Sequence, residues 1–331
     1  MLDTSNVTDM AHMFERCGYY SEVFILDLGN NFDTSNVTDM TKMFYYCGFS
    51  NKYFILNLGN NFDTSSVTNM TCMFDNCGYN SGIFTLNLGN KFDTRNVTSM
   101  FMMFHSCGHA SKAFTLDLGD KFDTSNVTNM SYMFYYCGYS SAEFTLDLGD
   151  KFNTSNVTNM SYMFCSCGYI NNAFTLDLGD EFDTSNVTDM SYMFYYCGLK
   201  SKVFTLDLGS KFHTSKVKDM SKMFINCGHD STVFTRLDLS GFSVSQDTKL
   251  NYFARFIPAT EIIFGEGWND AVLPTAGTDK SAFYCGSNVP TKVIGATPNL
   301  HAYDWAADNR TVTLSLKHIS EPTRPEPISY A

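Results

Sequence analysis

The sequence predicts an α/β repeat protein, a right-handed solenoid with one helix and one short parallel β-strand in each 30-residue unit. Three observations support this prediction. A 30-residue period holds for eight units over residues 1–240, with Arg236 as its single extra residue. Each unit contains one segment with helical spacing and one with strand alternation. All seven prolines, which would each remove a donor from a stacked sheet, follow the repeats, from Pro258 onward.

The helix is expected in the first half of each unit. In the fifth unit, apolar residues recur at spacings that place them on one helical face, namely Val127, Met130, Met133, Phe134 and Cys137. Asn126 precedes this stripe as a candidate N-cap. Gly138 follows it and is suited to the left-handed conformation that commonly ends a helix.

The strand is expected in the second half of each unit, where apolar and polar residues alternate. Phe144, Leu146 and Leu148 would point toward the core, and Thr145 and Asp147 would point outward. Stacked in register, such strands form a parallel sheet with about 4.8 Å between neighbours. The outward positions then line up as polar columns.

The chain divides into three parts. Residues 1–242 form the predicted solenoid. Residues 243–316 lose the register and are expected to form a degenerate C-terminal cap over the apolar end of the solenoid, or a small independent module. Residues 317–331 resemble translated vector sequence and are predicted to be a non-native tail. The chain opens directly on a repeat, so an export signal is expected upstream of it.

The repeat resembles a known family. The string from Phe182 to Cys197, FDTSNVTDMSYMFYYC, followed by FTLDL from Phe204 to Leu208, is similar to the BspA-like leucine-rich-repeat proteins of bacterial surfaces. The resemblance covers residues 1–242 and implies a leucine-rich-repeat-like solenoid. It also implies an extracellular or cell-surface, adhesin-like protein that recognises a host, matrix or other-cell protein.

Composition narrows the possible partners. The net charge of −12 argues against nucleic acid and against anionic membranes, because both repel an acidic surface. The sequence contains no run of about 18 apolar residues, so we expect no direct membrane insertion by this chain. The histidines fall at different repeat positions, and no phosphate loop, zinc helix or serine elbow is present. We therefore expect a protein partner and no enzymatic activity.

The first candidate binding surface is the outward face of the sheet. It consists of Thr and Asp columns, represented by Asp117, Thr145, Asp147, Thr175, Asp177, Thr205 and Asp207. The simplest interpretation of the Asp column is a solvated acidic face. Calcium binding is the weaker alternative, because one carboxylate per coil supplies fewer than the six to eight oxygens that calcium prefers. We predict no cofactor and no dedicated metal site.

The second candidate surface is the edge of the predicted helices, formed by Tyr132, Tyr135, Tyr162, Tyr192 and Tyr195. These tyrosines lie off the apolar stripe and should be partly exposed, as interface residues often are. They could instead cover the sides of neighbouring helices. Two other functions remain open at this stage, a structural spacer that holds another domain away from the cell and carbohydrate binding by exposed tyrosines.

Eight of the eleven cysteines recur every 30 residues, from Cys17 to Cys227. They are expected to be buried, reduced thiols, because packed helices stand about 8–10 Å apart and a disulfide needs Cα atoms within about 6.8 Å. Cys72 and Cys165 fall outside this column and are expected near the surface.

Overall fold

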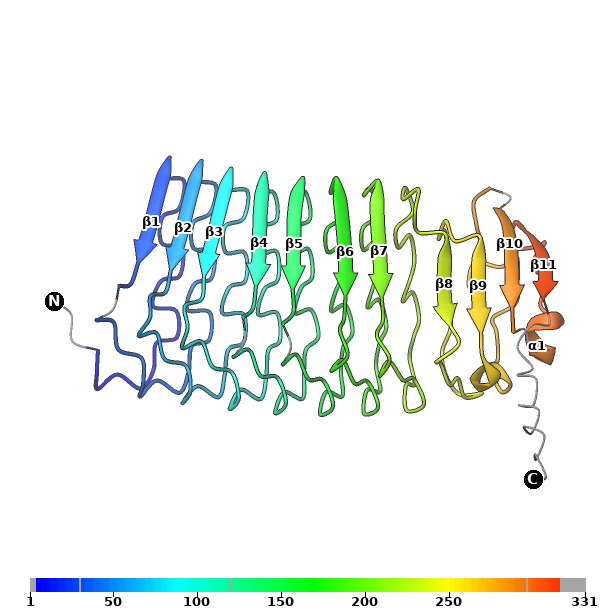
Figure 1. Cartoon of the computed structure of the whole chain (residues 1–331), viewed down its shortest axis with the longest axis horizontal. Helices are drawn as coiled ribbons and strands as arrows, with labels where there is room; N and C mark the ends of the chain where they lie inside the picture. Colours follow the sequence, from blue (N-terminus) through cyan, green and yellow to red (C-terminus); the bar gives the residue numbers. More distant parts are fainter. Residues whose placement is uncertain are drawn as a thin grey trace, which may run out of the picture.

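The protein is a parallel β-solenoid of about nine turns, shown by a computed structural model that describes residues 4–29, 31–119, 121–149, 151–287, 289–295 and 297–315 (Figure 1). Each 30-residue unit forms one coil of the solenoid, and each coil contributes one segment to the side of the solenoid that carries the strands. The strands of the described residues are β1 (Val23–Asp27), β2 (Tyr53–Asn57), β3 (Ile83–Asn87), β4 (Ala113–Asp117), β5 (Glu143–Asp147), β6 (Ala173–Asp177), β7 (Val203–Asp207), β8 (Arg236–Leu239), β9 (Glu261–Phe264), β10 (Val289–Ile294) and β11 (Arg310–Ser315).

The predicted strand half of the unit is confirmed. Strands pair in parallel with partners 30 residues apart, as Phe114 does with Phe144. In β5 the ring of Phe144 is buried, whereas Thr145 and Asp147 are exposed. The ladder is not continuous along the molecule, because it is divided into β1–β5, β6–β7 and β8–β11.

The predicted helix half of the unit is wrong. Residues 127–130 are extended, with a parallel bridge at Asn129, and residues 131–140 form a succession of turns. The helices among the described residues are only η1 (Glu266–Trp268), a 3₁₀ helix, and α1 (Pro298–His301). Tyr132 and Tyr136 have φ values of 60° and 57°, a left-handed conformation that the interior of an α-helix excludes. The α/β leucine-rich-repeat-like class is therefore replaced by a parallel β-solenoid.

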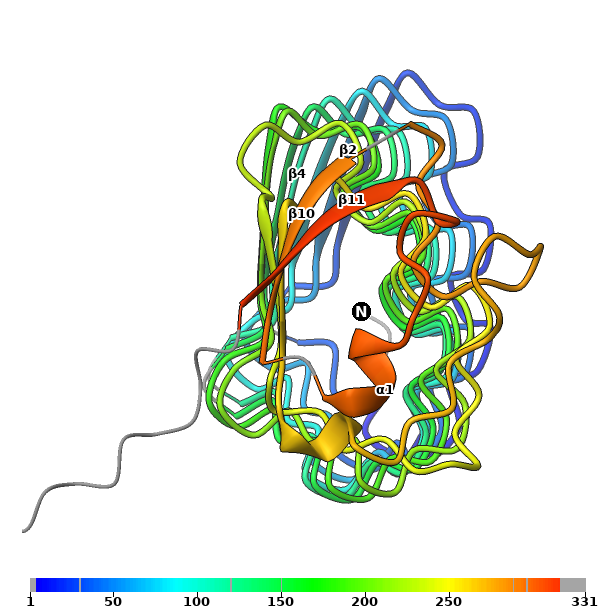
Figure 2. The same cartoon turned by 90° about the vertical axis from the view of Figure 1, so that its right-hand side faces the viewer.

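The hydrogen bonds of this segment explain why it is not a helix. The amides of Tyr132 and Phe134 donate to carbonyls in the next coil, those of Ser161 and Met163, at 3.0 and 2.9 Å. An α-helix would keep such bonds within one segment. Alternate amides instead link coil to coil and give the solenoid a second hydrogen-bonded side facing the sheet across the core (Figure 2). The turns also bring residues three and four apart to one side, so the helical spacing was misleading.

One continuous apolar core fills the inside of the coils. The residues of the predicted helical stripe are its turn-side members, and all five in the fifth unit are fully buried. From the strand side, the ring of Phe144 stacks on Phe114 and lies against Phe174, with centroids 5.7 and 5.4 Å apart. The stripe therefore predicted the core residues correctly, although the backbone that carries them is not helical.

Asn126 is not a helix N-cap. Its side-chain amide donates to the carbonyl of Arg95 in the preceding coil at 2.6 Å. Asn156 and Asn186 make the same contact with the carbonyls of Ser125 and Ser155. The repeated asparagine therefore fastens one coil to the next, which accounts for its presence in nearly every unit.

Residues 243–315 add less regular coils to the C-terminal end. Strands β9, β10 and β11 extend the sheet that begins with β8, and α1 lies at this end of the solenoid (Figure 2). The core continues here through Trp268, whose ring lies 6.3 Å from Phe242 and 4.9 Å from Phe264. In the part of the chain that the structure describes, no helix has the length and apolarity to cross a bilayer. The tail predicted at 317–331 lies outside the described residues.

Candidate functional site

The outer face of the sheet brings the predicted Thr and Asp residues together in two columns. Thr145 lies in register with Thr115, and Asp147 lies in register with Asp117. The pair β6–β7 repeats this arrangement with Thr175, Asp177, Thr205 and Asp207. The Thr hydroxyl groups bond along the column, at 3.0 Å between coils four and five and at 2.9 Å between coils six and seven.

Each aspartate of the column also holds the turn that follows its strand. One carboxylate oxygen of Asp147 accepts the amide of Gly149 at 3.0 Å, and Asp207 accepts that of Gly209 at 2.9 Å. These bonds give the Asp column a structural role and offset part of the repulsion between neighbouring carboxylates. Among the described residues, no three His, Cys, Asp or Glu side chains gather as metal ligands. The absence of a cofactor stays a prediction, and calcium binding on the Asp column stays its weaker alternative.

An apolar patch on the same face was not predicted. It is formed by the outward residues of β1–β3, namely Val23, Ile25, Tyr53, Ile55 and Ile83, which are 57%, 59%, 42%, 39% and 45% exposed. The strands place these side chains next to one another in register. The signal was present in the sequence, because Ile25 and Ile55 stand where later units have Thr. We call this cluster the apolar patch.

The sheet is interrupted twice, and a polar side chain marks each break. Between β5 and β6, the side-chain amide of Asn171 donates to the backbone carbonyl of Phe144 at 3.0 Å. Between β7 and β8, the hydroxyl of Ser231 accepts the amide of Phe204 at 3.0 Å. In both cases a side chain bonds a backbone group of the preceding strand that a regular ladder would use.

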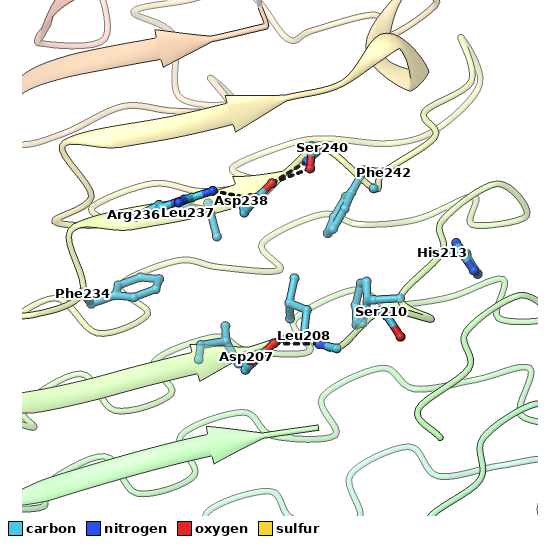
Figure 3. A pocket seen from close by; sticks show the side chains of 14 residues that line it. Asp207, Leu208, Ser210, His213, Phe234, Arg236, Leu237, Asp238, Ser240 and Phe242 are labelled. Atoms are coloured by element: carbon cyan, nitrogen blue, oxygen red, sulfur yellow. Dashed lines mark hydrogen bonds and ion pairs between the residues drawn. The ribbon is translucent and has the colours of Figure 1, made fainter. Parts of the chain in front are cut away.

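The second break opens a cleft of about 520 Å³ (Figure 3). Its wall includes Leu206 and Phe234, which come from positions that normally face the core. Leu206 is only half-buried, whereas the equivalent Leu176 is fully buried. On the rim, the guanidinium of Arg236 pairs with the carboxylate of Asp238 at 2.8 Å. The register slip at Arg236 was visible in the sequence, but its consequence for the sheet was not predicted.

The predicted tyrosines lie on the turn side of the solenoid and contact one another. Tyr132, Tyr162 and Tyr192 form a stack with centroids 4.5 and 4.2 Å apart. Tyr135 packs edge-on against Tyr132, and Tyr195 stacks on Tyr196. All five predicted tyrosines are half-buried. Because neighbouring rings occupy many of their faces, the cluster serves packing at least as much as it offers a binding platform.

A second aromatic stack, which was not predicted, includes a histidine. The ring of His109 lies between Tyr79 and Tyr139, with centroids 4.4 and 4.7 Å away. Its Nδ1 atom is buried and makes no hydrogen bond. Burial, with a smaller contribution from His105, lowers the pKa of His109 to about 4 from its ordinary value of 6.5. The stack therefore favours the neutral imidazole.

We expect the His109→Tyr variant to remove a pH-dependent loss of stability. Folding favours neutral His109, so its contribution is fully present above pH 6.5 and is lost as the pH falls toward the folded pKa of about 4. After discounting for partial exposure, the effect is about 2 kcal/mol. Urea unfolding between pH 4 and 7 should show that the free energy of unfolding falls less for the variant than for the wild type as the pH is lowered. The same pH dependence of stability in the variant and the wild type would contradict this prediction. His229→Tyr, at an exposed position of the same column, is the control.

Seven of the eight cysteines of the column are buried as predicted, and Cys17 is half-buried. The spacing argument behind their reduced state was wrong. Coils joined by backbone hydrogen bonds stand about 4.8 Å apart, not 8–10 Å, so distance alone does not exclude disulfides. All eleven cysteines are free thiols. Burial raises the pKa of Cys107 and Cys137 well above 9.0, which disfavours the reactive thiolate. Cys72 and Cys165, expected near the surface, are also buried.

The fold and its surfaces define the class of this protein, which is a tandem-repeat β-solenoid whose outer sheet face is covered by no other described segment. The chain belongs to the family described as "Mycoplasma protein of unknown function, DUF285", whose model matches residues 1–116, 49–176 and 137–256. No curated protein and no solved structure matches the chain. The overlapping matches agree with the tandem repeat, whereas the description does not name the BspA-like proteins.

Proposed function

We propose that this protein is a non-enzymatic, adhesin-like binding protein of the cell surface or secreted space, which recognises a protein partner through the outer face of its sheet. The observation that carries the proposal is the apolar patch on β1–β3. Five exposed apolar side chains stand in register on a strand face that no other described segment covers. Contiguous exposed apolar surface in a water-exposed protein typically marks an interaction site.

The remaining outer face supports binding over catalysis. Its polar residues recur as columns instead of converging on one centre, which suits an extended partner better than a single reaction. The resemblance of the repeat to BspA-like surface proteins favours a partner among host or extracellular-matrix proteins. The acidic surface disfavours nucleic acid. No observation favours carbohydrate binding, because the tyrosine faces are largely used by stacking.

Paired variants on the sheet face test this proposal. Ile25→Thr/Ile55→Thr places in β1 and β2 the residue that later coils carry at the same position, so the fold should be retained. Binding to a panel of immobilised extracellular-matrix proteins, measured by surface plasmon resonance, should weaken about tenfold or more, since two buried apolar contacts are lost. Thr145→Ala/Asp147→Ala/Thr175→Ala/Asp177→Ala tests the polar columns in the same assay.

The control is Thr128→Ala/Thr158→Ala, which alters an exposed column outside the sheet. Circular dichroism and thermal unfolding should be nearly unchanged for the Ile25/Ile55 and control variants. If both sheet-face variants bind the panel as the wild type does, or if the wild type binds none of it, the proposal is wrong. A structural spacer would tolerate every one of these substitutions.

A further inference from the structure

The break between β7 and β8 differs from the rest of the sheet because one residue is inserted there. Seven coils read Phe-X-Leu-X-Leu through the strand, whereas the eighth reads Phe234-Thr235-Arg236-Leu237-Asp238-Leu239. An extra residue in a strand bulges it and ends its pairing. The positions of Leu206 and Asp207 in β7 are therefore taken in β8 by Leu237 and Asp238, but the two strands form no ladder with each other. Figure 1 shows the wider separation of β7 and β8.

The insertion leaves two strand edges facing the cleft without a ladder partner among the described residues. β7 pairs only with β6, and β8 pairs only with β9. Unpaired strand edges are templates for another extended chain, which supplies the missing backbone hydrogen bonds. Between these edges the apolar side chains of Leu206, Phe234 and Leu237 line the cleft. Figure 3 shows Phe234 and Leu237 there.

The charge of the rim limits which extended chain fits. Asp207 and Asp238 stand on either side of the cleft. The positive charge of Arg236 is engaged by Asp238 at 2.8 Å and by Glu261 at 3.8 Å. Glu261 is also paired with Lys292 at 3.2 Å, so it adds no excess charge, and the cleft lining carries two carboxylates, Asp207 and Asp238, against the one guanidinium of Arg236. The rim is therefore acidic. A segment with basic residues would complement it, and an acidic segment would be repelled.

We propose that this cleft binds an extended peptide segment in which apolar and basic residues alternate. The peptide backbone pairs with the edge of β8, or with that of β7 beyond Phe204, whose amide is bonded by Ser231. Its apolar side chains contact Leu206, Phe234 and Leu237, and its basic side chains face Asp207 and Asp238. The inference deepens the proposed function by naming the chemistry of a partner segment, and it rests on that function. Its site lies several coils away from the apolar patch.

The break between β5 and β6 serves as an internal comparison. Its cleft, of about 470 Å³, is also bordered by strand residues, including Leu146 and Asp177. No residue is inserted there, so both strands keep the 30-residue offset of the paired coils. A side chain bonds one strand edge at each break, Asn171 at Phe144 and Ser231 at Phe204, so the inserted residue is what distinguishes the two breaks. We therefore place the peptide site at β7–β8 alone.

Deletion of Arg236 tests the proposal, because it restores the sequence Phe-Thr-Leu-Asp-Leu and the regular period. The probe is a short fluorescent peptide of alternating valine and lysine, titrated with the full chain and followed by anisotropy. We expect micromolar binding by the wild type and a loss of about tenfold or more in the deletion variant. Arg236→Thr keeps the insertion and removes the positive charge, so it should bind the peptide at least as tightly as the wild type.

Hydrogen exchange gives a measurement that does not depend on the deletion variant folding. Peptide binding should slow amide exchange in β7 and β8 and leave β5 and β6 unchanged. The proposal is overturned if a valine–glutamate peptide binds equally well, if the deletion variant folds and binds equally well, or if neither strand is protected. If the peptide fails while Ile25→Thr/Ile55→Thr still weakens matrix binding, the cleft proposal alone is rejected. If matrix binding fails while the peptide protects β7 and β8, only the sheet-face proposal falls.

Discussion

Replacing Gly138 with alanine should lower the free energy of unfolding of the surrounding coils by about 3 kcal/mol. Gly138 has a φ of 56°, and a Cβ atom placed on it would lie 2.3 Å from Cγ of Phe144. The ring cannot move aside, because it is buried between Phe114 and Phe174. The variant therefore combines a left-handed backbone with overpacking of the core.

Gly119→Ala separates these two causes. Gly119 has a φ of 71°, but a Cβ atom there would meet no other atom within 4 Å. Its replacement should cost only the backbone term, about 1 kcal/mol. Urea unfolding followed by circular dichroism, with hydrogen exchange to locate the affected coils, compares the two variants. Equal losses would show that Phe144 adapts and that the stacked rings are not rigid.

The strand, the core and the repeat could be predicted from sequence, because each depends on a local pattern that the structure preserves. Alternation in the segment around Phe144 has one structural meaning, a strand with one buried face. Burial of Met130, Met133 and Phe134 also followed from spacing. The outward Thr and Asp columns needed only the 30-residue register, and they lie where expected.

The turn segment could not be predicted correctly, because its hydrogen bonds are made to neighbouring coils. Whether the amide of Tyr132 donates four residues back or to Ser161 in the next coil cannot be decided from one unit alone. Tyrosine is also a poor indicator of the left-handed conformation that Tyr132 adopts. A better signal was the lack of Asp, Glu, Lys and Arg in this segment of the fourth, fifth and sixth units, because a helix packed on one face usually exposes a charged one.

The candidate cleft could be predicted only in part. Arg236 was recognised as an extra residue, but a bulge and a broken ladder follow only from the three-dimensional pairing of β8 with β9. The apolar patch was readable in the outward positions of β1 and β2. It was missed because the consensus residues of the repeat, and not the departures from them, were taken as the binding surface.

The C-terminal coils contain a buried arginine that has no counterpart among the described residues of the repeats. Arg310 is 1% exposed, and its guanidinium donates to the carbonyls of Phe283, Ala259 and Ile257 and to the hydroxyl of Thr291, at 2.8–3.3 Å. Burial lowers its pKa below the ordinary value. The second buried charge of this region is Asp308, which accepts bonds from two backbone amides and from the hydroxyl of Tyr303.

Arg310→Met should destabilise this region by about 3–5 kcal/mol, because it removes the guanidinium donor from three buried carbonyls and leaves the charge of Asp308 uncompensated. Both tryptophans, Trp268 and Trp305, lie in these coils, so their fluorescence during urea unfolding reports this region specifically. The exposed Arg236→Met is the matched control and should change stability by less than about 0.5 kcal/mol.

A double-mutant cycle with Asp308→Asn tests the electrostatic part of this argument. If the two buried charges support each other, the double variant should lose less than the sum of the single variants, by about 1 kcal/mol or more. Strict additivity would show that Arg310 acts only through its hydrogen bonds to carbonyl groups. Because solenoid coils are stabilised mainly by their neighbours, the amides of β2–β6 should keep their exchange rates in every variant. A loss of their protection would instead show that the whole solenoid unfolds as one unit.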